Sequence, residues 1–92
     1  MIVVYTQAAL TDLNGIADYL IHRNPDGAAK VERDIRATID RLTVHPFSGR
    51  QQDEATVRKA VSPSYRYRIF YAVDAGNGVV QVLAILHPSR DG

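Results

Sequence analysis

The chain has 92 residues, of which 46% are apolar and 23% charged, a composition typical of one folded domain and not of a disordered segment. Eleven basic residues nearly balance ten acidic ones, so the net charge of +1 gives no argument for nucleic-acid binding. Cysteine is absent, which excludes disulfides, thiolate chemistry and cysteine-based metal sites.

The first half of the chain predicts one short strand and two helices. Residues 2–5, "IVVY", are β-branched or aromatic, and Thr6 follows as a helix N-cap. Apolar side chains then recur every three or four positions over residues 8–22 and again over residues 28–44. "NPDG" at residues 24–27 separates these patterns, because proline ends one helix and suits the first turn of the next. We expect an antiparallel helical hairpin.

The second half predicts three strands. "HPFSGRQQDEA" at residues 45–55 interrupts the helical pattern and is expected to be an exposed connection. Strands are expected at residues 56–61, 65–73 and 79–86, with Gly76, Asn77 and Gly78 forming a tight hairpin turn before the last. The order β-α-α-β-β-β predicts one α+β domain over residues 1–92: a helical hairpin packed on one face of a small, mostly antiparallel four-stranded sheet.

Arginines are the candidate functional side chains of the predicted sheet. Period-two alternation in "YRYRIFYAV" places Arg66 and Arg68 on one face of their strand, and Arg58 adjoins Lys59 in the preceding strand. Together with Arg90, these residues could form a local basic surface on a chain that is nearly neutral. The alternation alone favours the simpler interpretation, in which the arginines solvate the outer face of a one-sided sheet.

The last predicted strand, "VVQVLAIL", carries apolar side chains on both of its faces. Val80, Val82, Ala84 and Leu86 alternate with Val79, Leu83 and Ile85. Such a strand is usually covered on both faces. Because the helical hairpin covers one face, the other is expected to be closed either by a partner or by a twisted neighbouring strand.

Histidines are the remaining residues with possible chemistry. His22, His45 and His87 are far apart and lack carboxylates at ligand spacing, so no metal site is expected. His22 suits the end of a helix, where it complements the dipole, and His45 precedes Pro46 in the connection. His87 leaves the end of a buried strand, where a histidine can act as a general acid or base, although a structural role is the commoner one.

The order of these segments resembles the RelE/ParE superfamily of type II toxins, over nearly the full length. The resemblance rests on "AALTDLNGIADYL", the "NP" break, "HPFSGR", "VRKAV", "YRYRIFYAV" and the closing "VLAILHPSRD". It implies a toxin without cofactors that is neutralised in a hetero-oligomer by a cognate antitoxin, whose C-terminal segment binds across it.

The superfamily has two mechanisms. RelE-like members are ribosome-dependent, metal-free messenger RNA endonucleases, in which the ribose 2′-hydroxyl attacks the adjacent phosphate. That reaction needs a base, an acid and cations around the phosphorane. ParE-like members poison DNA gyrase by binding to it and are not known as nucleases.

The resemblance favours the ParE branch. The ending "AILHPSRD" is similar to the close of ParE-like members, Lys30 and Lys59 are the chain's two lysines, and the C-terminal His-Tyr pair of some RelE members is absent. For a nuclease, the candidates are Arg58, Arg66 and Arg68 as phosphate stabilisers, with His87 or a strand tyrosine as acid or base. For target binding, Lys59 and Arg90 join them. A third hypothesis is a detoxified member that only binds the antitoxin.

The expected location is the cytoplasm. The segment "MIVVYTQAAL" lacks the charged leader of a signal peptide, and no apolar stretch approaches membrane-spanning length.

Overall fold

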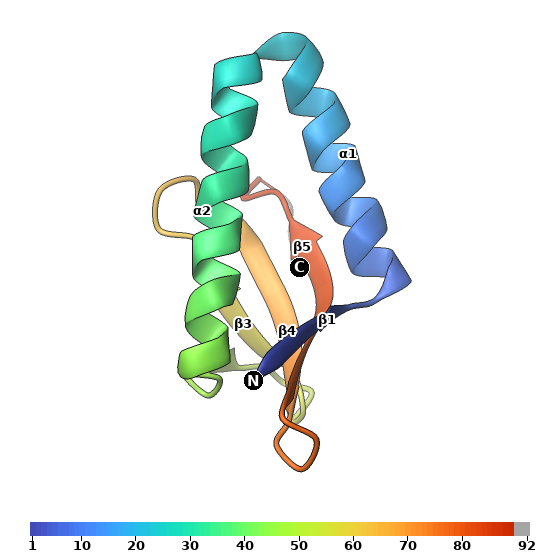
Figure 1. Cartoon of the computed structure of the whole chain (residues 1–92), viewed down its shortest axis with the longest axis vertical. Coiled ribbons are helices and arrows are strands. Elements are labelled where there is room, and N and C mark those ends of the chain that lie inside the picture. Colours follow the sequence, from blue (N-terminus) through green and yellow to red (C-terminus); the bar gives the residue numbers. More distant parts are fainter. Residues whose placement is uncertain (90–92) are drawn as a thin grey trace.

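The computed structural model describes residues 1–89 (Figure 1). Within these residues the chain forms two helices and five strands, in the order β1 (Ile2–Tyr5), α1 (Gln7–Arg23), α2 (Pro25–Val44), β2 (Arg50–Gln51), β3 (Arg58–Val61), β4 (Arg68–Asp74) and β5 (Val79–Leu86). The predicted α+β class and element order are therefore confirmed, with one additional strand.

Side-chain caps define the helical hairpin. The Thr6 hydroxyl accepts a hydrogen bond from the Ala9 N–H at 3.1 Å, which confirms Thr6 as the N-cap of α1. Asn24 serves both helices: its N–H donates to the Leu20 carbonyl at 2.7 Å, and its side-chain oxygen accepts the Gly27 N–H at 3.0 Å. Helix α2 therefore begins at Pro25, three residues before the expected start at Ala28.

The sheet has the strand order β1-β5-β4-β3-β2. Strand β1 pairs in parallel with β5, from Ile2 opposite Val79 to Tyr5 opposite Val82, and the other pairs are antiparallel. The expectation of a mostly antiparallel sheet is confirmed. The expectation of four strands is wrong, because Arg50 and Gln51 in the predicted connection pair with β3 as a two-residue strand too short to leave a periodic pattern.

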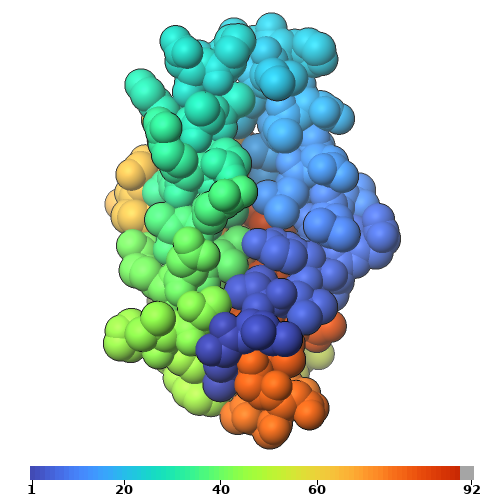
Figure 2. All heavy atoms as spheres, in the orientation of Figure 1, coloured from blue at the N-terminus to red at the C-terminus, as the bar shows by residue number. Residues whose placement is uncertain are grey.

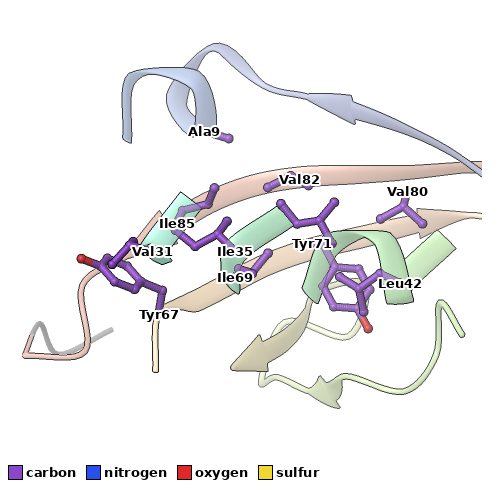
Figure 3. Packing of buried hydrophobic residues seen from close by; sticks show 11 residues of the cluster. Ala9, Val31, Ile35, Leu42, Tyr67, Ile69, Tyr71, Val80, Val82 and Ile85 are labelled. Atoms are coloured by element: carbon purple, nitrogen blue, oxygen red, sulfur yellow. The ribbon is translucent and has the colours of Figure 1, made fainter. Parts of the chain in front are cut away.

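Both helices cover the same face of the sheet, and the apolar core lies between the two layers (Figure 1). Figure 3 shows side chains of β4 and β5 meeting those of α2, and Ala9 of α1 belongs to the same buried cluster. The buried cluster consists of Ala9, Val31, Ile35, Ile39, Leu42, Tyr67, Ile69, Tyr71, Val80, Val82 and Ile85.

A β-bulge in β5 changes which side chains face the helices. Tyr71 lies opposite Val82 while Phe70 lies opposite Ala84, so Leu83 is an extra residue in β5. Beyond it Ile85 joins Val80 and Val82 in the core. The predicted grouping of Ala84 and Leu86 with Val80 and Val82 is therefore wrong, and the bulge explains part of the strand's apolar character at both parities.

Strands β3 and β4 both begin later than predicted, at Arg58 and Arg68. Before β4, Arg66 has φ +64 and its N–H donates to the Ser62 carbonyl at 2.9 Å, which closes a turn. The prediction that Arg66 and Arg68 share a strand face is therefore wrong, because strand alternation does not apply inside a turn.

The face of the sheet turned away from the helices is uncovered in the part of the chain that the structure describes. It bears exposed apolar side chains, including Ile2 (64%), Val4 (43%) and Val61 (40%). Its central residues, among them Phe70, are half-buried by their neighbours in the sheet. Neither α1 nor α2 is long and apolar enough to cross a membrane.

Candidate functional site

A groove of about 440 Å³ lies between α1 and the end of β5. Ile16, Tyr67 and Ile85 supply apolar surface, and Asp12, Tyr19 and His87 supply polar groups. Gly15 of α1 also lines the groove, and a Cβ placed on it would meet no atom within 4 Å. The groove is therefore open and brings helix α1 next to the closing segment of the chain.

Tyr67 and His87 meet at this groove. Their ring centroids are 5.5 Å apart with the planes at 85°, an edge-to-face arrangement. Tyr67 is 4% exposed, whereas His87 is exposed. Burial raises the pKa of Tyr67, and the nearby Tyr19 contributes in the same direction. The Tyr67 hydroxyl is consequently protonated at neutral pH and can act as a hydrogen-bond donor.

The imidazole of His87 is oriented by Ser89. The Ser89 N–H donates to Nδ1 at 3.0 Å, and the Ser89 hydroxyl lies 2.7 Å from the same nitrogen. Because a backbone N–H can only donate, Nδ1 is an acceptor and the proton of the neutral ring sits on Nε2. His87 thus offers a donating Nε2–H to a ligand, and its use as a base at Nε2 requires a change of tautomer.

Arg68 stands at the start of β4, opposite Leu86 of β5, on the uncovered face of the sheet. One of its terminal nitrogens donates to the Pro88 carbonyl at 3.1 Å. The structure therefore brings Arg68, Tyr67 and His87 to the same end of the sheet. Arg90, the remaining candidate of the closing segment, lies outside the described residues.

Arg58 lies elsewhere and is engaged within the protein. Its Nη1 donates to the carbonyls of Phe47 at 3.1 Å and Gly49 at 2.9 Å, and its guanidinium carbon lies 5.2 Å from the Phe47 ring centroid. It pairs with Tyr71, which faces the helices, whereas Arg68 faces the opposite side. Arg58 and Arg68 consequently do not converge on one ligand.

Lys59 and Arg66 are separated from both arginines. Lys59 lies on β3 between Arg50 of β2 and Phe70 of β4, and Arg66 is exposed in the turn before β4. Arg58, Arg66 and Arg68, the arginines of the predicted basic surface that the structure describes, therefore occupy three different environments.

Two carboxylates that position this end of the molecule were missed by the sequence reasoning. Asp12 of α1 accepts the Ile85 N–H of β5 at 2.9 Å, beyond the point where the pairing of β1 with β5 ends. Asp34 accepts the N–H groups of Ser64 at 3.2 Å and Tyr65 at 2.7 Å. Asp34 follows Val31 by three residues on the buried stripe of α2, a spacing that could have indicated its burial.

Hydrogen bonds compensate the burial of Asp34. Burial raises the pKa of the carboxyl group, but donors from Ser62, Tyr65 and Ser64 together outweigh it and hold the pKa below its ordinary value of 3.8. Asp34 is therefore a carboxylate that fixes the turn before β4.

No group of three or more histidine or acidic side chains that could hold a metal ion occurs within residues 1–89. The side chains around the groove offer hydrogen-bonding groups, aromatic surface and the charge of Asp12 to a ligand.

Comparison with known proteins identifies the family. Residues 3–92 match the family described as the ParE toxin of type II toxin-antitoxin systems, parDE. The chain belongs to the ParE toxin family. The RelE/ParE resemblance is thereby confirmed, and the chain is a toxin of the type II toxin-antitoxin class.

Similar proteins agree with this assignment. The toxin is 31% identical over 88 residues to Toxin RelE2 of Caulobacter vibrioides, covering 96% of each chain. It is 31% identical over 83 residues to Putative toxin Y4kP of Sinorhizobium fredii, covering 90% of the toxin and 83% of that relative. A solved chain of the chromosomal ParDE TA system from P. aeruginosa has the same fold, with a TM-score of 0.78 at 23% identity over 95% of each chain.

Proposed function

We propose that this toxin acts in the cytoplasm by binding DNA gyrase and poisoning it, which arrests growth, and that a cognate antitoxin neutralises it in a hetero-oligomer. In this proposal the toxin breaks no bond itself. Membership of the ParE family supports the gyrase branch. The observation that carries the non-enzymatic part is the position of Arg58 and Arg68 on opposite faces of the sheet.

Ribonuclease chemistry needs a base, an acid and cations that converge on one phosphate. Arg58 donates to two carbonyls on the helix side, and Arg66 lies in a turn. His87 accepts from Ser89 at Nδ1. The groups at the end of β4 and β5 instead suit recognition, in which Arg68, Tyr67 and the exposed His87 form polar contacts beside the groove between α1 and β5.

The experiment is a supercoiling assay with purified gyrase and relaxed plasmid. We expect the toxin to inhibit supercoiling and to accumulate cleaved DNA, and the mixture with its antitoxin to restore activity. Full gyrase activity at several-fold molar excess of toxin would contradict the proposal. Induction without any growth defect would instead identify a detoxified member that retains antitoxin binding.

A ribosome-dependent endonuclease is the second candidate. It is supported by the name of the relative Toxin RelE2 and by the proximity of Tyr67, Arg68 and His87 at one end of the sheet. Primer extension on messenger RNA after induction tests it: new cuts that disappear in His87→Gln would favour cleavage, and growth arrest with intact messages would exclude it.

A further inference from the structure

Gly15 lies where neither the backbone nor the packing of the toxin needs a glycine. It is inside α1, its φ is not positive, and a Cβ placed on it would meet no atom within 4 Å. Glycine inside a helix is less favourable than alanine, because glycine loses more conformational freedom on folding. Gly15 therefore weakens α1, and no contact within residues 1–89 explains why it is there.

The missing side chain widens the groove between α1 and the end of β5. Asp12, Gly15 and Tyr19 follow one another at intervals of three and four residues, so they share the side of α1 that lines this groove. Figure 1 shows α1 beside the end of β5, and Figure 2 shows the outer side of α1 (light blue) with no other segment over it in that view. At Gly15 the wall of the groove is bare backbone, which is typical of a place where a ligand approaches closely.

The groove has the charge of a site for a cation. Asp12 is the one acidic side chain among the described residues that line it, and no lysine or arginine lines it. The Oδ2 atom of Asp12 accepts the Ile85 N–H at 2.9 Å, whereas Oδ1 accepts no hydrogen bond within residues 1–89. Because Asp12 is half-buried, water screens its charge only in part, and a cation in the groove is attracted more strongly than at the open surface.

Aromatic rings favour a guanidinium group as that cation. Tyr19 and Tyr67 both line the groove. The guanidinium carbon of Arg23, which does not line the groove, lies 4.3 Å from the centroid of the Tyr19 ring, and Tyr19 is still 59% exposed. The Tyr19 ring thus already binds one guanidinium over one of its faces. Arginine stacks on aromatic rings more readily than lysine, so a carboxylate beside two tyrosines fits arginine best.

We infer that this groove binds an arginine side chain of gyrase, with the guanidinium at Asp12 and the aliphatic stem over Gly15. The inference rests on the proposed function, which names gyrase as the target. The groove adjoins Tyr67 and His87 of the proposed recognition site, and the Nε2–H of His87 can donate to a backbone carbonyl of the same gyrase segment. An acidic or purely apolar segment would leave the charge of Asp12 without a partner.

Supercoiling assays with the full-length toxin and gyrase test the groove. Asp12→Asn keeps an oxygen for the Ile85 N–H but removes the charge, and should raise the toxin concentration for half-inhibition about tenfold. Tyr19→Leu keeps apolar surface without the aromatic face, and should raise it about threefold.

Substitutions of Gly15 should separate stability from activity. Gly15→Ala should raise the melting temperature by a few degrees and yet weaken inhibition about threefold, because its methyl group occupies the groove. Gly15→Leu should fill the groove and weaken inhibition about tenfold or more without lowering the melting temperature. A residue with a structural role alone would not change the two measurements in opposite directions.

Ala17→Leu and Asp18→Asn are the matched controls. Both residues are exposed on α1 and do not line the groove. Ala17→Leu adds the same side chain as Gly15→Leu, and Asp18→Asn removes the same charge as Asp12→Asn. Each control should inhibit gyrase within about twofold of the wild type, as expected for surface substitutions away from a contact.

A second measurement uses the toxin without gyrase. N-acetyl-arginine amide, titrated to millimolar concentration into isotope-labelled toxin, should shift the amide resonances of Gly15 and Ile85. N-acetyl-glutamate amide should leave them in place, and Asp12→Asn should abolish the shifts caused by the arginine probe.

The outcomes are distinct. Wild-type inhibition by Gly15→Leu and Asp12→Asn would overturn the inference and leave the proposed function intact. Failure of the wild-type toxin to inhibit gyrase would overturn the proposed function and the choice of gyrase, whereas binding of the arginine probe at Gly15 would still support the chemistry of the groove. Weaker antitoxin binding by Gly15→Leu with full gyrase inhibition would assign the groove to the antitoxin and overturn the inference. Probe binding only after Arg90→Gln would show that the chain's own Arg90, which lies outside the described residues, fills the groove, and would overturn it as well.

Discussion

The hydroxyl group of Tyr71 organises the segment after α2. It donates to the Pro46 carbonyl at 2.8 Å and accepts the Gly49 N–H at 2.8 Å, and Arg58 secures the carbonyls of Phe47 and Gly49. A Cβ on Gly49 would overlap the Tyr71 hydroxyl, so glycine is required by this close approach. These four hydrogen bonds hold the backbone of the segment, and the Phe47 ring is exposed.

Replacing Tyr71 by Phe should lower the free energy of unfolding. The Gly49 N–H is buried and would lose its partner, at a cost of about 1–3 kcal/mol. Urea denaturation measures the change. Tyr65→Phe is the matched control, because Tyr65 is exposed and its substitution should stay within about 0.5 kcal/mol. Equal stability of the two variants would contradict the role of the Tyr71 hydroxyl.

Asp34 makes stability depend on acid. The pKa of Asp34 in the folded protein lies below the ordinary 3.8. The hydrogen bonds to its carboxylate therefore add their full contribution to the free energy of unfolding above that pH, and this contribution is lost as the pH falls through the folded pKa. Asp34→Asn should be less stable than the wild type at neutral pH, and this difference should shrink on acidification below about pH 4. Urea midpoints over a pH series measure it, and a pH-independent difference would exclude the charge as the cause.

Arg58 has a different role from the one expected from the sequence. The sequence suggested an arginine that belongs to a basic surface or solvates the outer face of the sheet. The structure shows a half-buried guanidinium that supports the segment from Phe47 to Gly49, so loss of stability is the expected effect of Arg58→Ala. Alternation along a strand indicates the face of a side chain but not its hydrogen-bond partners.

Helix α1 contains a glycine, Gly15, at a position where an alanine side chain would fit. Gly15 lies inside the helix, where glycine costs about 0.5–1 kcal/mol relative to alanine, and a Cβ there would meet no atom within 4 Å. Gly15→Ala should therefore raise the free energy of unfolding by about that amount. Gly27→Ala is the control within α2, because a Cβ at Gly27 would approach the side chain of its cap Asn24 to 2.6 Å. A gain at both positions would contradict this explanation.

The elements were predictable where local signals are strong. Apolar spacing, Thr6 and the Asn24-Pro25 pair define both helices without reference to the rest of the chain. Strand β2 and the turn at Arg66 were not predictable in this way. Two residues cannot show a period, and the turn depends on Asp34, which is distant in sequence.

The site was predictable in part. The position of His87 at the end of a central strand follows from the apolar run before it. Its edge contact with Tyr67 and its bond to Ser89 depend on the turn before β4 and the turn after β5, which carry no periodic signal. Membership of the family came from the order of the motifs, not from any one residue.

At the scale of the whole molecule, the hairpin extends past the end of the sheet (Figure 1). The residues around Asn24, from Ile21 to Asp26, are all exposed, whereas β4 and β5 contribute Ile69, Tyr71, Val80, Val82 and Ile85 to the buried cluster. We expect amide hydrogens near Asn24 to exchange faster than those of β4 and β5, because local opening there exposes little apolar surface. Hydrogen exchange followed by mass spectrometry tests this, and slow exchange at the hairpin tip would contradict it.

The parallel pairing of β1 with β5 has a consequence for synthesis on the ribosome. Strand β1 is made first, and its strand neighbour β5 is the last of the described elements to be made, with Ile2 opposite Val79. Strand β5 also pairs with β4, so β1 cannot join the rest of the sheet until β5 has been made. The nascent chain therefore cannot assemble the surface around His87 and Arg68 in stages, and a product truncated before Val79 should be harmless to the cell that makes it.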